Sequence, residues 1–99
     1  MILLHRSIGV APGRNMSAIG FAREVAAYVK KNYDRDMEVL APVGGNPHRV
    51  AWLIRYTDLA DMEAGSAKLV QDKQYWELLN KNTDNFIAGS AMDSIWRTL

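Results

Sequence analysis

The sequence predicts an α+β fold in which a four-stranded antiparallel sheet carries two helices on one face. The hydrophobic pattern changes along the chain in the order strand, helix, strand, strand, helix, strand. This β-α-β-β-α-β order is that of a ferredoxin-like sandwich. The 99 residues match the length of one domain, so we expect a single domain over residues 1–99.

The first predicted strand and helix are separated by a change of hydrophobic period. Residues 2–10 are apolar and rich in strand-forming side chains. Apolar side chains at helical spacing then extend over residues 16–33. Asn15 or Ser17 is the expected N-cap, because a short polar side chain can accept from the first free backbone N–H groups.

The stretch "IGVAPGRNMS" between them contains glycine, a basic residue and a helix start, which are ingredients of a phosphate-binding loop. The phosphate-binding motif G-x-x-x-x-G-K-[ST] has four residues between its glycines and lysine after the second glycine. Here only three residues separate Gly9 from Gly13, and Arg14 follows. The stretch is therefore interpreted as a corner over residues 11–15, in which Gly13 adopts a backbone conformation that other residues avoid.

A hairpin and a closing strand supply the rest of the predicted sheet. Residues 37–43 and 48–57 are apolar and β-branched, and the turn sequence Gly-Gly-Asn-Pro at 44–47 separates them. Residues 86–99 form the closing strand, with an interruption near its glycine and serine.

Between hairpin and closing strand, the sequence predicts a helical region with a break. Asp58 is placed to cap its start. Asp72 is placed to cap a second segment, so we expect the helix to bend or break near Gln71.

The third strand is apolar on both faces, which argues that both faces of the sheet are buried. The helices cover one face, and a second copy of the chain is the economical cover for the other, so we expect a homodimer through the sheet faces. The two faces of the strand consist of His48, Val50, Trp52, Ile54 and Tyr56, and of Arg49, Ala51, Leu53 and Arg55.

The chain resembles the dimeric α+β barrel superfamily, in particular its NIPSNAP-like and antibiotic-biosynthesis-monooxygenase-like branches. The resemblance rests on "APGR", "GGNPHRVAWLIRYTDLADME", "DKQYWELL" and "GSAMDSIWR", and it spans nearly the whole chain. It implies that two chains pack sheet against sheet and that a ligand pocket lies between the sheet and the helices of each. Members include cofactor-independent oxygenases, haem-degrading enzymes and lactone isomerases.

Composition excludes several classes of function. The net charge of +1 argues against nucleic-acid binding, and the absence of cysteine excludes disulfides and thiolate chemistry. Two histidines argue against a histidine-rich zinc site, so neither a metal nor a cofactor is predicted. The apolar run at residues 1–4 is too short for a signal peptide or a membrane span, so a soluble, cytoplasmic protein without membrane contact is expected.

Arg6 and His5 are the candidate catalytic residues. Arg6 shares its face with the apolar Ile2, Leu4 and Ile8 and needs a partner there. It either anchors an acidic or carbonyl-bearing ligand or forms a salt bridge near the strand end or across the dimer. His5 lies on the opposite face, where it serves as a proton shuttle or as an interface histidine.

Aromatic side chains define a candidate ligand pocket together with Arg6. Trp52 and Tyr56 share one face of the third strand, and Trp76 is expected to meet them from the second helix. The alternative is an ordinary aromatic core. Two further arginines, Arg49 and Arg55, lie on the other face of this strand. They either bind an anion or pair with Glu38 or Asp93 across the dimer, and the pairing is the favoured interpretation. His48 is expected to be solvated.

Two functions follow as hypotheses. The first is a cofactor-independent oxygenase or isomerase acting on a small aromatic or carbonyl compound. In the related oxygenases a polar group, often Asn, Trp or His, binds or deprotonates the substrate. Trp52 matches such a place, whereas the first strand has Arg6 or His5 and no Asn. The second hypothesis is a non-catalytic dimeric protein that binds a ligand or a partner.

Overall fold

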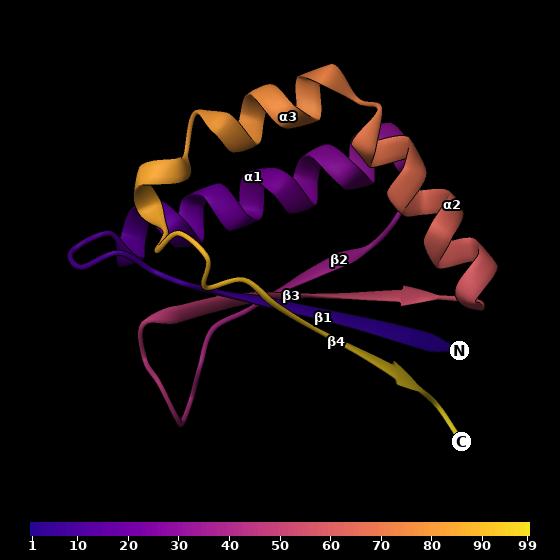
Figure 1. The fold of residues 1–99 in the computed structure, drawn as a ribbon, viewed down its shortest axis with the longest axis horizontal. Coiled ribbons are helices and arrows are strands. Elements are labelled where there is room, and N and C mark those ends of the chain that lie inside the picture. The colour runs from indigo at the N-terminus through magenta and orange to yellow at the C-terminus, as the bar shows by residue number, and fades with distance from the viewer.

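A computed structural model describes all residues, 1–99. One four-stranded antiparallel sheet in the order β2-β3-β1-β4 carries every helix on one face (Figure 1). The fold class predicted from the sequence, α+β with the ferredoxin-like order, is confirmed. The elements are β1 (Ile2–Gly9), α1 (Asn15–Tyr33), β2 (Met37–Leu40), β3 (Arg49–Tyr56), α2 (Leu59–Val70), α3 (Lys73–Asn80), the 3-10 turn η1 (Thr83–Asn85) and β4 (Met92–Arg97).

The helical region breaks where the sequence predicts. The Asp58 side chain accepts a hydrogen bond from the backbone N–H of Asp61 and caps α2. The Asp72 side chain accepts from the backbone N–H of Tyr75 and caps α3. Because the two caps are separated by one ordinary helix length, the chain forms two helices that meet at an angle (Figure 1).

The predicted cap of α1 is wrong. Neither Asn15 nor Ser17 caps this helix, which begins at Asn15 after Arg14, a residue whose side chain makes no capping bond. The reason is the preceding turn, in which the backbone N–H of Arg14 donates to the carbonyl of Ala11 at 3.0 Å. Gly13 has φ 75°, the left-handed conformation expected of it in this corner.

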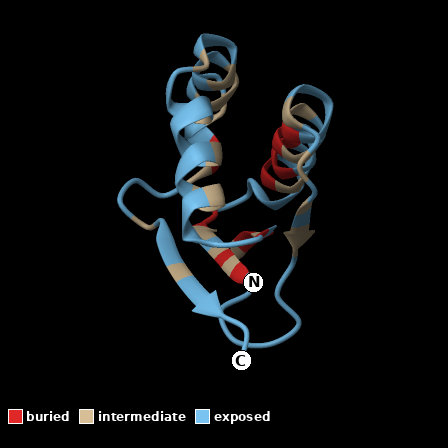
Figure 2. Ribbon diagram, turned by 90° about the vertical axis from the view of Figure 1, so that its right-hand side faces the viewer, coloured by how far each residue is buried: buried red, intermediate tan, exposed pale blue.

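The core lies between the sheet and α1. Figure 2 shows the buried residues on the sheet-facing side of α1 and in the strands below it, whereas β4 is largely exposed. In strand register, Arg6 is paired with Trp52 on β3 and with Asp93 on β4. The helix-facing side of β1 thus places a charged residue beside the core. None of the helices combines the length and the apolar character needed to cross a membrane.

Candidate ligand cavity and its polar pair

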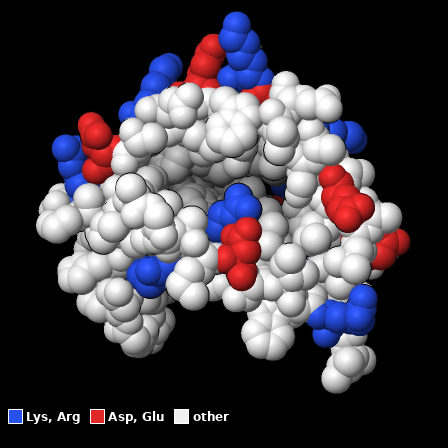
Figure 3. All heavy atoms as spheres, in the orientation of Figure 1, with Lys and Arg blue, Asp and Glu red and all other residues white.

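A cavity of about 590 Å³ lies between the helices and the sheet. Fifteen of its 20 lining residues are hydrophobic. Figure 3 shows the hollow beneath the arch of helices, with one basic and one acidic side chain together at its mouth. The charged residues that line it are Arg6 and Asp93. Its volume is in the range of pockets that hold small organic ligands.

Arg6 and Asp93 form a bidentate ion pair. Arg6 Nε donates to Asp93 Oδ1 at 2.7 Å, and Arg6 Nη2 donates to Asp93 Oδ2 at 2.8 Å. Their side chains are 51% and 41% exposed, so the pair lies at the cavity mouth rather than in its depth. The hydrogen bonds to Asp93 raise the pKa of Arg6, and the same bonds lower the pKa of Asp93. Both groups are therefore charged at neutral pH.

The ion-pair partner of Asp93 differs from the partner expected from the sequence. The sequence hypothesis paired Asp93 with Arg49 or Arg55 across a dimer, whereas the structure pairs it with Arg6 of the same chain. Arg55 forms an ion pair with Glu38 at 2.6 Å, which is one of the partners expected for it, but the pair lies within one chain. Arg49 donates to the Ser7 hydroxyl and to the carbonyl of Ser90.

A signal for the Arg6 partner was present in the sequence. Asp93 is the only acidic residue after Asp84, and it stands in the last predicted strand. A buried or half-buried guanidinium on a neighbouring antiparallel strand needs such a partner. The missing information was the register that places Arg6 opposite Asp93.

Trp52 and Tyr56 line the cavity from β3. The Trp52 side chain is held in place by its indole N–H, which donates to the carbonyl of Ala22 in α1 at 3.1 Å. Both residues are buried, with 8% and 4% of their surface exposed. These two aromatic residues therefore form a rigid part of the cavity floor beside Arg6.

Trp76 does not line the cavity, contrary to the expectation from sequence. Its neighbour Tyr75 does. Trp76 is 45% exposed, and its indole N–H donates to the carbonyl of Val70 at 2.9 Å. The break before α3 rotates this helix relative to α2, so its cavity side cannot be inferred from the spacing of α2.

The phenols of Tyr56 and Tyr75 also line the cavity and feel the charge of Arg6. Burial raises the pKa of Tyr75, and the positive charge of Arg6 opposes that shift. Burial likewise raises the pKa of Tyr56, against the opposing charges of Arg35 and Arg6. Both phenols are therefore protonated at neutral pH and are available as hydrogen-bond donors.

His5 does not share the cavity. It lies on the opposite face of the sheet, between Leu53 and Ser94 in strand register. As strand parity predicts, His5 thus lies away from Arg6, and it cannot act as a base on a ligand in the cavity of its own chain. His48 is exposed and follows the β2–β3 connection. No group of three or more His, Cys, Asp or Glu side chains is arranged to hold a metal ion.

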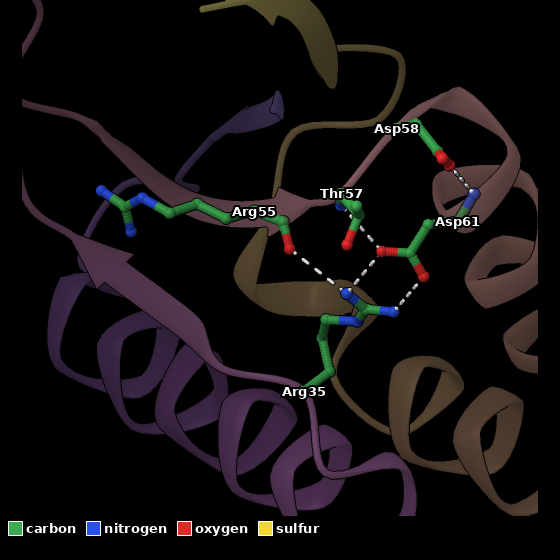
Figure 4. Close-up of polar contacts among 5 residues, drawn as sticks. All are labelled: Arg35, Arg55, Thr57, Asp58 and Asp61. Atoms are coloured by element: carbon green, nitrogen blue, oxygen red, sulfur yellow. Dashed lines mark hydrogen bonds and ion pairs between the residues drawn. The ribbon is translucent and has the colours of Figure 1, made fainter.

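Tyr56 is also fixed from its other side. Arg35 forms a two-point ion pair with Asp61, with its Nη2 to Asp61 Oδ1 at 2.7 Å and its Nη1 to Oδ2 at 3.1 Å. The Arg35 guanidinium carbon lies 4.5 Å from the centre of the Tyr56 ring. Figure 4 shows this cluster, in which Arg35 also reaches the carbonyl of Arg55 and Asp61 accepts from the backbone of Thr57. The cluster joins the ends of α1 and β3 to the start of α2.

No protein-family model and no curated protein sequence matches the chain. Solved structures share its fold. An uncharacterized NIPSNAP domain protein from Burkholderia xenovorans has a TM-score of 0.84 and 12% identity, over 100% of this chain and 95% of that one. A NIPSNAP family protein with unknown function from Agrobacterium tumefaciens has a TM-score of 0.80 and 15% identity, over 97% and 86%. A structure described as an antibiotic biosynthesis monooxygenase has a TM-score of 0.73 and 8% identity, over 100% and 99%.

These similarities concern the fold, because the identities are low. They cover nearly the full length of the chain, so they include the sheet, α1 and the helices that enclose the cavity. The chain therefore has the ferredoxin-like α+β fold that the NIPSNAP proteins and this monooxygenase share.

Proposed function

We propose that the chain is a cofactor-independent enzyme of the oxygenase or isomerase type that acts on a small aromatic or carbonyl compound held in the cavity. The observation that carries the proposal is the cavity itself. It combines apolar walls with one guanidinium that retains unused N–H groups. A monooxygenase with the same fold agrees with this proposal.

Each lining group has a role in this proposal. Arg6 donates to the carbonyl oxygen of the ligand and stabilises negative charge that develops on that oxygen. Asp93 holds the Arg6 guanidinium in one orientation. Trp52 and Tyr56 offer flat apolar surface to an aromatic ring. The Tyr75 hydroxyl is a second donor on the helix side of the same space.

The proposal is tested by screening phenols, quinols, lactones and haem for a ligand-induced rise in the melting temperature. Hits are then incubated with the protein and followed by oxygen consumption and by NMR for isomerisation. We expect Arg6→Met to abolish the ligand-induced rise while it lowers the melting temperature of the free protein little, because half-exposed ion pairs contribute about 0–1 kcal/mol. Arg14→Met is the matched control, because Arg14 is exposed and lies outside the cavity.

A non-catalytic ligand-binding or interaction protein is the alternative function. The same screen distinguishes it, because binding without turnover of any hit supports this alternative. A screen without any hit for the unmodified protein contradicts the enzyme and the ligand-binding protein, and it leaves the interaction protein.

We also propose that two copies of the chain pair through the sheet face that the helices leave free. Apolar side chains from all four strands share this outer face in register, and a two-fold axis lets an identical apolar face cover it. The residues are Leu3, Leu40, Ala51, Leu53, Met92 and Trp96.

A further inference from the structure

The charge of the cavity is balanced within the chain. Arg6 is its only basic lining residue and Asp93 its only acidic one, and they are bonded to each other. The space that a ligand enters thus has no net charge. An arginine alone in such a cavity would attract carboxylates, but this arginine already has one.

The bonding pattern leaves Arg6 partly available. Its Nε and Nη2 atoms donate to the two oxygens of Asp93, whereas Nη1 has no hydrogen-bond partner in the chain. A ligand oxygen can therefore accept from the guanidinium without displacing Asp93. Such a ligand shares the one Arg6 guanidinium with the carboxylate of Asp93.

We infer that the cavity is selective for uncharged carbonyl compounds and that Asp93 is the residue that excludes carboxylates. This inference rests on the proposed function and specifies its substrate class. A ligand ketone accepts from Arg6 Nη1 and carries no charge for Asp93 to repel. A ligand carboxylate makes the same contact but adds a second negative charge to the one guanidinium that already pairs with Asp93, at the mouth of a cavity whose walls are mostly hydrophobic.

The first experiment measures three dissociation constants for the unmodified protein by isothermal titration calorimetry. The probes are 2-acetonaphthone, 2-naphthoate and naphthalene. The first two have nearly the same shape and differ by one charge, and naphthalene reports the apolar cavity alone. We expect 2-acetonaphthone to bind more tightly than 2-naphthoate by about tenfold or more.

The second experiment changes the charge without changing the shape. Asp93→Asn retains an oxygen that accepts from Arg6 but removes the negative charge. We expect this variant to reverse the order, so that 2-naphthoate binds more tightly than 2-acetonaphthone. Asp84→Asn makes the same change in net charge at an exposed position outside the cavity, and it should leave the ratio unchanged.

The outcomes separate this inference from the proposed function. If naphthalene and both derivatives fail to bind, the ligand cavity is refuted, and the inference falls with it. If naphthalene binds but 2-naphthoate equals or exceeds 2-acetonaphthone in the unmodified protein, only the selectivity is refuted. An unchanged ratio in a folded Asp93→Asn variant removes Asp93 as its cause, and the comparison in the unmodified protein stands even if that variant does not fold.

Discussion

At the scale of single residues, the structure uses arginine in two different ways. Arg6 leaves N–H groups free at a cavity mouth, whereas Arg35 uses its planar guanidinium to join three elements. The Arg35 and Asp61 side chains are less exposed than the Arg6 pair, at 29% and 28%. Bidentate bonding of this kind requires the fixed geometry of guanidinium, which lysine lacks.

Arg35→Lys should therefore destabilise the protein although it preserves the charge. It loses one of two hydrogen bonds to Asp61 and the flat stacking over Tyr56, for an expected loss of about 1–2 kcal/mol in the free energy of unfolding. Urea denaturation followed by circular dichroism measures this. Arg23→Lys, at an exposed position of α1 without an ion-pair partner, is the control and should change little. Equal stability of the two variants would contradict the structural role of Arg35.

A second residue-scale prediction concerns Trp52. Trp52→Phe removes the indole N–H that donates to Ala22 and leaves a small void at the cavity floor. We expect the free energy of unfolding to fall by about 1–2 kcal/mol. The same denaturation measurement tests this, and a stability equal to that of the unmodified protein would show that the bond to Ala22 contributes nothing.

The sheet face on which a side chain lies was predictable from the sequence, because side chains alternate between the two faces along a strand. Within each strand, parity puts Trp52 and Tyr56 on one face and separates Arg6 from His5, as the structure has them. Parity does not give the register between strands 87 residues apart, so the bond between Arg6 and Asp93 could not be predicted.

At the scale of elements, local signals predicted the starts of helices better than the extent of strands. The aspartates before α2 and α3 cap them as expected, because a cap depends on neighbouring backbone alone. The strand predicted over 37–43 ends at Leu40, before Pro42, which lacks the N–H that a ladder requires. The hairpin connection is consequently longer than the four residues expected.

The closing strand is also shorter than predicted, at Met92–Arg97 instead of 86–99. Phe86 makes only an isolated bridge to Val10, and the chain then turns through Gly89 at φ 75°. Ser90 fixes this turn because its hydroxyl bonds to the Ile87 carbonyl and accepts from the backbone N–H of Gly9. The contacts of Phe86 with Val10 and of Ser90 with Gly9 are tertiary, so the apolar pattern alone could not predict this break in the strand.

One carboxylate at the start of α3 bonds to two tyrosines of α1, which gives an element-scale prediction. Asp72 accepts from the hydroxyls of Tyr28 at 2.6 Å and Tyr33 at 2.5 Å. The hydrogen bond to Asp72 raises the pKa of Tyr28 from 10.0 to about 12. A pKa that is higher in the folded than in the unfolded protein stabilises the fold fully below pH 10, and this stabilisation is lost as the pH rises towards 12.

Tyr28→Phe should therefore lower the denaturation midpoint at pH 8, and its difference from the unmodified protein should shrink as the pH rises above 10. Because the other tyrosines and lysines titrate in both proteins, the difference isolates Tyr28. Hydrogen exchange should also become faster in α3 of the variant at pH 8. A difference in midpoint that stays constant up to pH 11 would show that Tyr28 does not act through its hydroxyl proton.

At the scale of the whole molecule, the two faces of the sheet are covered differently. The helices cover one face, and the cavity lies between them and the sheet. The other face carries apolar side chains that include Trp96, which is 64% exposed. A stable interface buries about 800 Å² on each partner. The total accessible surface of one chain is 6710 Å², so such an interface would cover about an eighth of it.

If two copies pair through this face, a charge at its centre should separate them. Leu53 lies on β3 beside His5 in the middle of the outer face, and Leu53→Glu would place two carboxylates in the apolar contact near the two-fold axis. We expect light scattering after size exclusion to give twice the mass of one chain for the unmodified protein at micromolar concentration, and the mass of one chain for Leu53→Glu. Leu59→Glu, at an exposed position of α2 on the helix side, should remain dimeric. An unmodified protein that is monomeric would refute the pairing but leave the cavity intact, because every residue that lines the cavity belongs to one chain.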